Sequence, residues 1–206
     1  MASLNRSRIH ISGILLASGA SRRIKSTKQL LIFQREYLIN IVINKILKSE
    51  IDELFVILGY QHDEIANVID TRPKIVDNPG WKIGKSSSIK TGVNSAQRTS
   101  DGVIFFMVDQ PFINKEIINT LINEFKGSID NIIVPRVNGH LCNPVLFGKK
   151  YYKELIGLSG EQGGKKIIKK AKDVRWVDWE DERLLLDIDT DEDYKNILIN
   201  YSVSSS

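Results

Sequence analysis

A loop of small residues near the start of the chain is the first segment that could carry chemistry. Residues 18–21 (SGAS) come directly after the apolar residues 14–17. Backbone N–H groups in such a loop can approach a ligand, because no bulky side chain blocks the way, and they favour anions. The loop then continues with four cations: Arg22, Arg23, Lys25 and Lys28.

Phosphate is the expected ligand of this loop, since Arg offers a planar fork to phosphate oxygens and Lys offers a point charge. The segment lacks the closing Gly-Lys-Ser/Thr of a Walker loop, and it lacks the Gly-x-Gly-x-x-Gly of a dinucleotide site. The alternative is a solvated basic loop in which Gly19 only makes a turn.

Three aspartates supply the candidate metal ligands. Asp109 ends the apolar run 102–109, and Pro111 stops that run two residues later. A carboxylate at a strand end near phosphates is a natural Mg²⁺ ligand. The alternative for Asp109 is a turn or helix-capping residue.

Asp187 and Asp189 alternate in the segment 184–190 (LLLDIDT), which we expect to be extended, so that both carboxylates face one side. Two carboxylates on one face repel each other unless a cation joins them, and this pattern favours a metal site. The alternative is a capped helix start with solvated acids. The later acids Asp191, Glu192 and Asp193 are better placed to serve the N-terminus of the closing helix.

The elements that must position these residues alternate between strands and helices, a pattern typical of a parallel sheet covered by helices. Ligands of such sheets collect outside the carboxyl ends of the strands. We expect strands at 9–17, 53–59, 73–77, 102–109, 131–137, 143–148 and 174–179. Helices are expected at 38–49, 62–69, 112–125 with Asn114 as its N-cap, 149–158, 163–171 and 191–201.

The composition limits the class of protein. The chain has 206 residues, 42% of them hydrophobic, and a formal net charge of +4, a mild excess that does not indicate a nucleic-acid partner. Cys142 stands alone, which excludes an internal disulfide and suits a reducing cytoplasm. With no apolar run of about 20 residues, we expect no membrane span. We predict one domain over 1–206, with flexible termini at about 1–9 and 202–206.

Taken together, the motifs resemble those of the molybdenum cofactor cytidylyltransferases and of the related guanylyltransferases. The segments 78–93, 109–111 (DQP) and 187–190 (DIDT) match this family in order, and 78–93 falls where the family has its nucleotide-side loop. The opening motif is matched by Leu16, Ala17, Ser18, Gly19, Ser21, Arg23, Ile24, Lys28, Leu30 and Leu31.

The resemblance implies a three-layer Rossmann-like nucleotidyltransferase fold, with a mostly parallel sheet and helices on both faces. It implies transfer of CMP from CTP, with Mg²⁺, to the terminal phosphate of a molybdopterin-type cofactor. Arg23, Lys28 and Asp109 would be catalytic, and Asp109 with Asp189 or Asp187 would bind the metal. The implied nucleotide-binding residues are Leu16, Ala17, Ser18, Gly19, Ala20, Ser21, Ser88 and Asp109.

Departures from the family pattern leave the base and the acceptor open. Ser18 stands where cytidylyltransferases carry Ala and guanylyltransferases carry Gly. Asn143, followed by Pro144, stands where the family has a histidine on its acceptor-side strand, and His140 is a possible substitute.

Three alternatives therefore stay beside the main hypothesis: a guanylyltransferase, an NTP transferase for another phosphorylated acceptor, and a non-catalytic nucleotide- or pterin-binding chaperone. The expected partners are the NTP, the phosphorylated pterin and a molybdoenzyme that receives the product.

Overall fold

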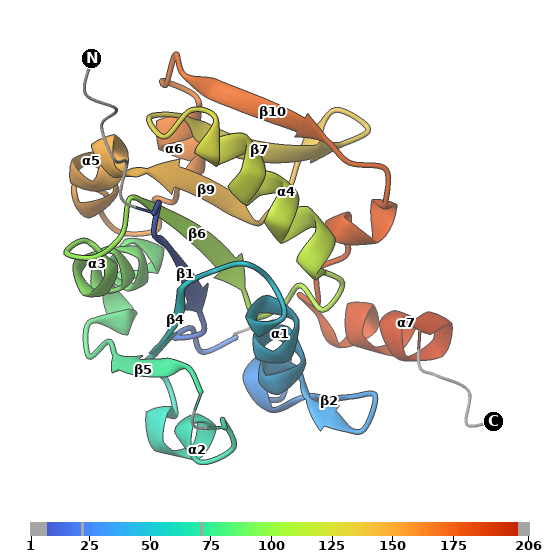
Figure 1. The fold of residues 1–206 in the computed structure, drawn as a ribbon. Helices are drawn as coiled ribbons and strands as arrows, with labels where there is room; N and C mark the ends of the chain where they lie inside the picture. Colours follow the sequence, from blue (N-terminus) through green and yellow to red (C-terminus); the bar gives the residue numbers. More distant parts are fainter. Residues whose placement is uncertain (1–7, 22, 71, 202–206) are drawn as a thin grey trace, which may run out of the picture.

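Within residues 8–21, 23–70 and 72–201, which the computed structural model describes, eight strands form one mixed sheet. Their order across the sheet is β10, β7, β9, β6, β1, β4, β5, and β8 pairs with β7 (Figure 1). The strands are β1 (Ile11–Leu16), β4 (Glu53–Leu58), β5 (Lys74–Asp77), β6 (Gly102–Met107), β7 (Ile132–Val137), β8 (His140–Leu141), β9 (Val145–Gly148) and β10 (Val174–Asp178).

Strand β1 lies at the centre of the sheet, parallel to β4 on one side and to β6 on the other. Leu16, the last residue of β1, is opposite Met107, the last residue of β6. The loops that follow these two strands therefore leave the same edge of the sheet. Strand β9 runs antiparallel to both β6 and β7, which makes the sheet mixed.

Helices cover both faces of the sheet, so the molecule has three layers (Figure 1). One face carries α1 (Leu38–Leu47), α2 (His62–Ala66) and α4 (Lys115–Lys126), and the other carries α3 (Lys85–Ala96), α5 (Tyr152–Ile156) and α6 (Lys165–Ile168). The closing helix α7 (Asp191–Tyr201) packs beside the hairpin of β2 (Ile32–Phe33) and β3 (Glu36–Tyr37). Short 3₁₀ helices are η1 (Lys28–Leu30), η2 (Trp81–Ile83), η3 (Lys149–Tyr151) and η4 (Glu182–Leu185).

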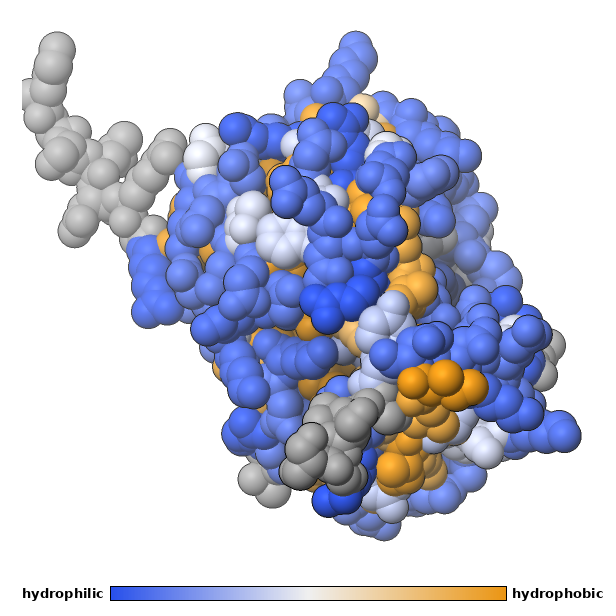
Figure 2. Space-filling view, turned by 90° about the vertical axis from the view of Figure 1, so that its right-hand side faces the viewer, coloured by the Kyte–Doolittle hydropathy of each residue, from blue (hydrophilic) through white to orange (hydrophobic). Residues whose placement is uncertain are grey.

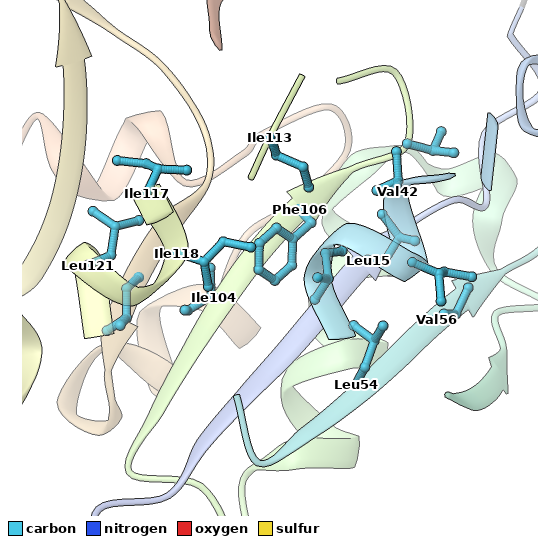
Figure 3. Close-up of a cluster of buried hydrophobic side chains, with 14 of the residues drawn as sticks. Leu15, Val42, Leu54, Val56, Ile104, Phe106, Ile113, Ile117, Ile118 and Leu121 are labelled. Atoms are coloured by element: carbon cyan, nitrogen blue, oxygen red, sulfur yellow. The ribbon is translucent and has the colours of Figure 1, made fainter. Parts of the chain in front are cut away.

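The larger hydrophobic core fills the space between the sheet and helices α1 and α4 (Figure 3). Leu15 of β1 and Phe106 of β6 point into it from the sheet, and Val42 and Ile118 meet them from the helices. Alternate residues of β1, such as Ile14, enter the second core under α3 and α5. Since both faces of β1 are covered, all six of its residues are buried, including Ser12.

A third, smaller core joins the two ends of the chain. Ile24 and Leu31, from the segment after β1, pack with Ile188 and with Ile197 of α7. The Tyr194 hydroxyl also donates to the carbonyl of Ile32 at 2.6 Å. This packing brings the C-terminal acidic segment to the loop that follows β1.

The surface on the α7 side is mostly hydrophilic and is interrupted by a compact hydrophobic patch (Figure 2). The exposed apolar side chains of α7 and β2 include Ile199 and Ile32. No helix in the described part of the chain has both the length and the apolar character needed to cross a bilayer.

The α/β architecture predicted from the sequence is confirmed, and so is the cap of α4, where the Asn114 side chain accepts from the N–H of Ile117 at 3.0 Å. Two local predictions are wrong. Asp187 and Asp189 do not lie on a strand, because η4 ends at Leu185 and an irregular segment follows. Ser88 belongs to helix α3 and not to a loop.

Three sequence predictions concern residues outside the described ranges. Arg22 is one of them, and the predicted flexible termini fall almost entirely on 1–7 and 202–206.

Candidate active site

A cavity of about 780 Å³ lies at the edge of the sheet where β1 and β6 end. The loop after β1, the end of β6, the N-terminal half of α3 and the turn before α6 form its walls. The segment after η4 closes one side and contributes Asp187 and Asp189. The cavity is therefore located where α/β proteins bind ligands.

Lys28 is the central cation of this cavity. Its Nζ lies 3.0 Å from Asp109 Oδ2 and 3.1 Å from Asp189 Oδ1, and its side chain is 8% exposed. Arg23 approaches the other oxygen of Asp189 at 3.0 Å, from a position largely in solvent. The two carboxylates, which are 80 positions apart in the chain, thus converge on one ammonium group.

This arrangement fits a divalent cation that shares its ligands with a substrate. The described residues contain no group of three or more His, Cys, Asp or Glu side chains preformed for a metal. Mg²⁺ is commonly bound by only one or two carboxylates together with substrate phosphates and water. Asp109 and Asp189 can supply these two carboxylates when Lys28 turns toward phosphate oxygens.

Asp187 lies in the same cavity but has a different partner. The Gln110 amide donates to Asp187 Oδ1 at 2.8 Å, while the Gln110 Oε1 atom is buried without a hydrogen-bond partner among the described residues. Burial raises the pKa of the Asp187 carboxyl, and the neighbouring charges of Asp109 and Asp189 add to the increase. A cation or a further hydrogen-bond donor in the cavity would therefore stabilise the ionised form of the Asp187 carboxyl.

Gln29, which the sequence did not single out, holds the loop after β1 in shape. Its Nε2 donates to the carbonyl of Ala17 at 2.6 Å and to that of Gly19 at 3.1 Å. These bonds turn the two carbonyls toward Gln29. The only local signal for this role is the position of Gln29 directly after Lys28 in η1.

The predicted nucleotide residues 16–21 and Ser88 all line the cavity. The Ser18 and Ser88 hydroxyl oxygens are 2.5 Å apart, which joins the loop after β1 to helix α3. Ser88 also accepts a hydrogen bond at 3.2 Å from Asn78, which the sequence had placed only in a family motif.

Of the predicted acceptor residues, Asn143 lines the cavity, whereas His140 is exposed on β8 and lies outside it. Pro144 follows a cis peptide bond and also lies outside the lining. Other lining residues to which the sequence gave no individual binding role include Gln29, Trp81, Lys82, Lys85 and Lys166.

Comparisons with known proteins identify the family of this chain. Over 196 residues, the chain is 23% identical to the purine catabolism protein PucB of Bacillus subtilis (strain 168), covering 90% of this chain and 94% of that protein. Over 133 residues, it is 30% identical to a "Probable molybdenum cofactor guanylyltransferase" of Natranaerobius thermophilus, covering 64% of this chain and 62% of that protein.

Among solved structures, a homologue of Mycobacterium tuberculosis Rv0371c from Mycobacterium sp. strain JC1 superposes with a TM-score of 0.82 at 27% identity. The match covers 92% of this chain and 95% of that one. A family model described as the MobA-like NTP transferase domain matches residues 13–174. The chain therefore belongs to the MobA-like NTP transferase domain family.

Proposed function

We propose that this protein transfers CMP from CTP to the terminal phosphate of a molybdopterin-type cofactor and releases pyrophosphate. The observation that carries the proposal is the convergence of Asp109 and Asp189 on Lys28, beside a loop of small residues at the strand edge. The lone cysteine suits action in a reducing cytoplasm, where a molybdoenzyme would receive the product.

The proposed chemistry needs no protein nucleophile, since the acceptor phosphate oxygen is already anionic. That oxygen forms a bond to the α-phosphorus of CTP, and the bond from this phosphorus to the bridging β-phosphate oxygen breaks. Catalysis is then positioning and charge neutralisation. Residues 18–21 of the loop would hold the triphosphate through backbone N–H groups, whereas the Ala17 N–H already donates to the carbonyl of Ile57 at 3.0 Å.

Lys28 and Arg23 would neutralise the charge that grows on the leaving pyrophosphate. Asp109, with Asp189 or Asp187, would hold Mg²⁺, which supplies positive charge to the phosphate oxygens when bound. Asn143 lines the cavity from the short segment between β8 and β9 and is the proposed contact for the pterin.

The test is release of pyrophosphate from each of the four NTPs, with Mg²⁺ and a phosphorylated pterin acceptor. We expect release with CTP and a loss of about 10²-fold or more in the Asp109→Asn variant. If no NTP and acceptor pair releases pyrophosphate while the cofactor still reaches its target enzyme, the carrier alternative is correct and the transferase proposal is wrong.

A second candidate donor is GTP, because the 30% identical relative is named as a probable guanylyltransferase. The ratio of kcat/KM for CTP to that for GTP separates the two. A ratio above one supports the cytidylyltransferase proposal, and a ratio below one replaces it with the guanylyltransferase.

A further inference from the structure

Asn78 is a buried polar residue that lies behind the wall of the cavity. It follows β5 directly, its side chain does not line the cavity, and the residue is 2% exposed. Its backbone N–H donates to the carbonyl of Leu58 at 2.8 Å, and its own carbonyl accepts from Trp81 at 3.1 Å. Both backbone polar groups of Asn78 are therefore hydrogen-bonded, which fixes the point from which its side chain extends.

The side-chain amide of Asn78 donates to two neighbouring hydroxyls at the start of α3. Its Nδ2 lies 3.0 Å from Ser87 Oγ and 3.2 Å from Ser88 Oγ. Ser87 passes its own proton back to the carbonyl of Gly84 at 3.0 Å and does not line the cavity. Ser88 lines the cavity and bonds to Ser18.

The hydroxyl protons in the hydrogen-bond chain from Asn78 through Ser88 to Ser18 can be counted. Since Ser88 accepts from Asn78, the bond between Ser88 and Ser18 uses one of the two hydroxyl protons, whichever serine donates. Among the described residues, the other hydroxyl proton has no acceptor. Both serines are almost fully buried, so this proton is available to a ligand in the cavity more than to bulk water.

We propose that Asn78 is a positioning residue: because it donates to Ser88, neither hydroxyl proton of the Ser18 and Ser88 pair is used to bond Asn78. The Ser18 and Ser88 pair then offers one hydroxyl proton to an acceptor atom of the bound nucleobase, either a ring carbonyl oxygen or a ring nitrogen. The inference rests on the proposed nucleotide site, and it assigns to Asn78 an effect on base binding without any contact to the nucleotide.

The variant Asn78→Asp reverses the hydrogen bond between residue 78 and Ser88. The side chain keeps almost the same size but gains a negative charge. A carboxylate cannot donate, so it accepts the Ser88 proton; Ser18 must then donate to Ser88, and no proton remains for the base. We expect the Kd for CTP with Mg²⁺, measured by calorimetry, to rise by roughly tenfold or more, because a buried base acceptor is left unpaired. KM should rise in parallel while kcat is retained.

Tripolyphosphate with Mg²⁺ is the probe that lacks a base. Its Kd should rise much less than the Kd for CTP, because tripolyphosphate responds only to the added negative charge at position 78, whereas CTP also loses the contact to its base. Ser87→Ala is the matched control, since it removes the other hydroxyl that Asn78 contacts, and it should leave the Kd for CTP unchanged.

A double-mutant cycle with Ser88→Ala separates a positioning role from a structural one. Once Ser88 is removed the chain is cut, so adding Asn78→Asp should cause no further loss of CTP affinity. Asn78→Ala covers the case in which the aspartate variant does not fold. It should weaken CTP binding less than Asn78→Asp, and this effect should also vanish without Ser88.

The inference is overturned if the Asn78 variants leave CTP binding unchanged, weaken tripolyphosphate as much as CTP, or act equally without Ser88. A natural protein that binds neither CTP nor GTP contradicts the proposed function itself, which is a separate result.

Discussion

Lys28 is a buried ammonium group that occupies the point where a divalent cation would meet two carboxylates. It touches Asp109 and Asp189 at about equal distances, 3.0 and 3.1 Å. Such a cation keeps the two acids close together in the absence of metal, since they would otherwise repel each other. Under the proposed function, it would also compete with Mg²⁺ for the same oxygens.

Replacing Lys28 with Met should therefore have opposite effects on metal binding and on catalysis. The Kd for Mn²⁺ without nucleotide, measured by electron paramagnetic resonance, should fall by roughly tenfold, because the competing charge is gone. The rate of pyrophosphate release should fall by about 10²-fold, because the leaving group loses a cation.

Lys25 offers a matched control for this substitution. It is an exposed cation of the same loop and does not line the cavity. Lys25→Met should leave both measurements unchanged. Weaker Mn²⁺ binding by Lys28→Met would show that Lys28 does not compete for the carboxylates.

Asp187 gives a pH-dependent prediction. Because burial raises its pKa above 3.8, the folded state binds this proton more tightly than the unfolded state does. The ionised carboxylate therefore lowers stability as the pH rises above 3.8. Asp187→Asn should unfold at a higher urea concentration than the natural protein at pH 7.5, and the difference should disappear near pH 4. A difference that is equal at both pH values would contradict this account.

At the scale of elements, the position of α3 on the sheet depends on Gly92. A Cβ atom there would lie 2.4 Å from Ile14 Cγ2, so any side chain must push the helix away from β1. Ser88 lies one helical turn earlier on α3, and such a shift would move it away from Ser18.

Gly92→Ala should lower the free energy of unfolding by about 2 kcal/mol, the usual cost of overpacking, and should also raise KM for the nucleotide. Urea unfolding and steady-state kinetics measure the two effects. Gly127, where a Cβ would meet only the Glu124 carbonyl at 3.5 Å, is the control site. If Gly92→Ala proves as mild as Gly127→Ala, the close approach of α3 to β1 is not needed.

Glu53 ties three strands together at the opposite end of the sheet. Although burial raises its pKa, hydrogen bonds from four side chains lower it to about 2. The donors are Ser12 of β1, Lys74 of β5, Thr99 in the turn after α3, and His10, which directly precedes β1.

The low pKa of Glu53 means that its stabilising effect is complete above about pH 4.5 and is lost as the pH falls toward 2. Glu53→Gln should lower the free energy of unfolding by about 1–2 kcal/mol at pH 7 and by much less near pH 2. Glu50→Gln removes an exposed pair with Lys126 and should cost less than about 0.5 kcal/mol. Equal costs for both variants would rule out a special role for the Glu53 network.

At the scale of the whole molecule, the cavity joins parts of the chain that are far apart in sequence. The segment after η4 is fastened to the end of β6 by the Ile188 N–H, which donates to the Asp109 carbonyl at 2.9 Å. The third core holds the same segment against the loop that follows β1. The cavity is therefore lined by residues from early and from late in the described chain.

Nucleotide with metal should accordingly stabilise the entire fold. At a CTP concentration of about 100 times Kd, with Mg²⁺, the expected gain is about 2.7 kcal/mol, or a rise of roughly 5–10 °C in Tm. Calorimetric scans with CTP, Mg²⁺ and both together test this expectation. In Asp189→Asn, Mg²⁺ should add little to the effect of CTP, and an unchanged Mg²⁺ effect would exclude Asp189 as a ligand.

The sequence by itself determined the alternation of strands and helices and the cap of α4, and it placed Asp109 at the end of a strand, although β6 ends at Met107 and Asp109 lies in the turn that follows. These features follow from local periodicity and turn chemistry, which neighbouring residues specify. The small-residue loop after β1 was recognisable for the same reason.

Only the tertiary structure decided which side chains meet. Lys28 contacts acids that are 81 and 161 positions away, and no local pattern encodes such a contact. Packing also placed Asp187 and Asp189 on an irregular segment, Ser88 on a helix and His140 outside the cavity. The physical reason is that these positions depend on how the three cores pack against one another, and packing is a property of the whole chain.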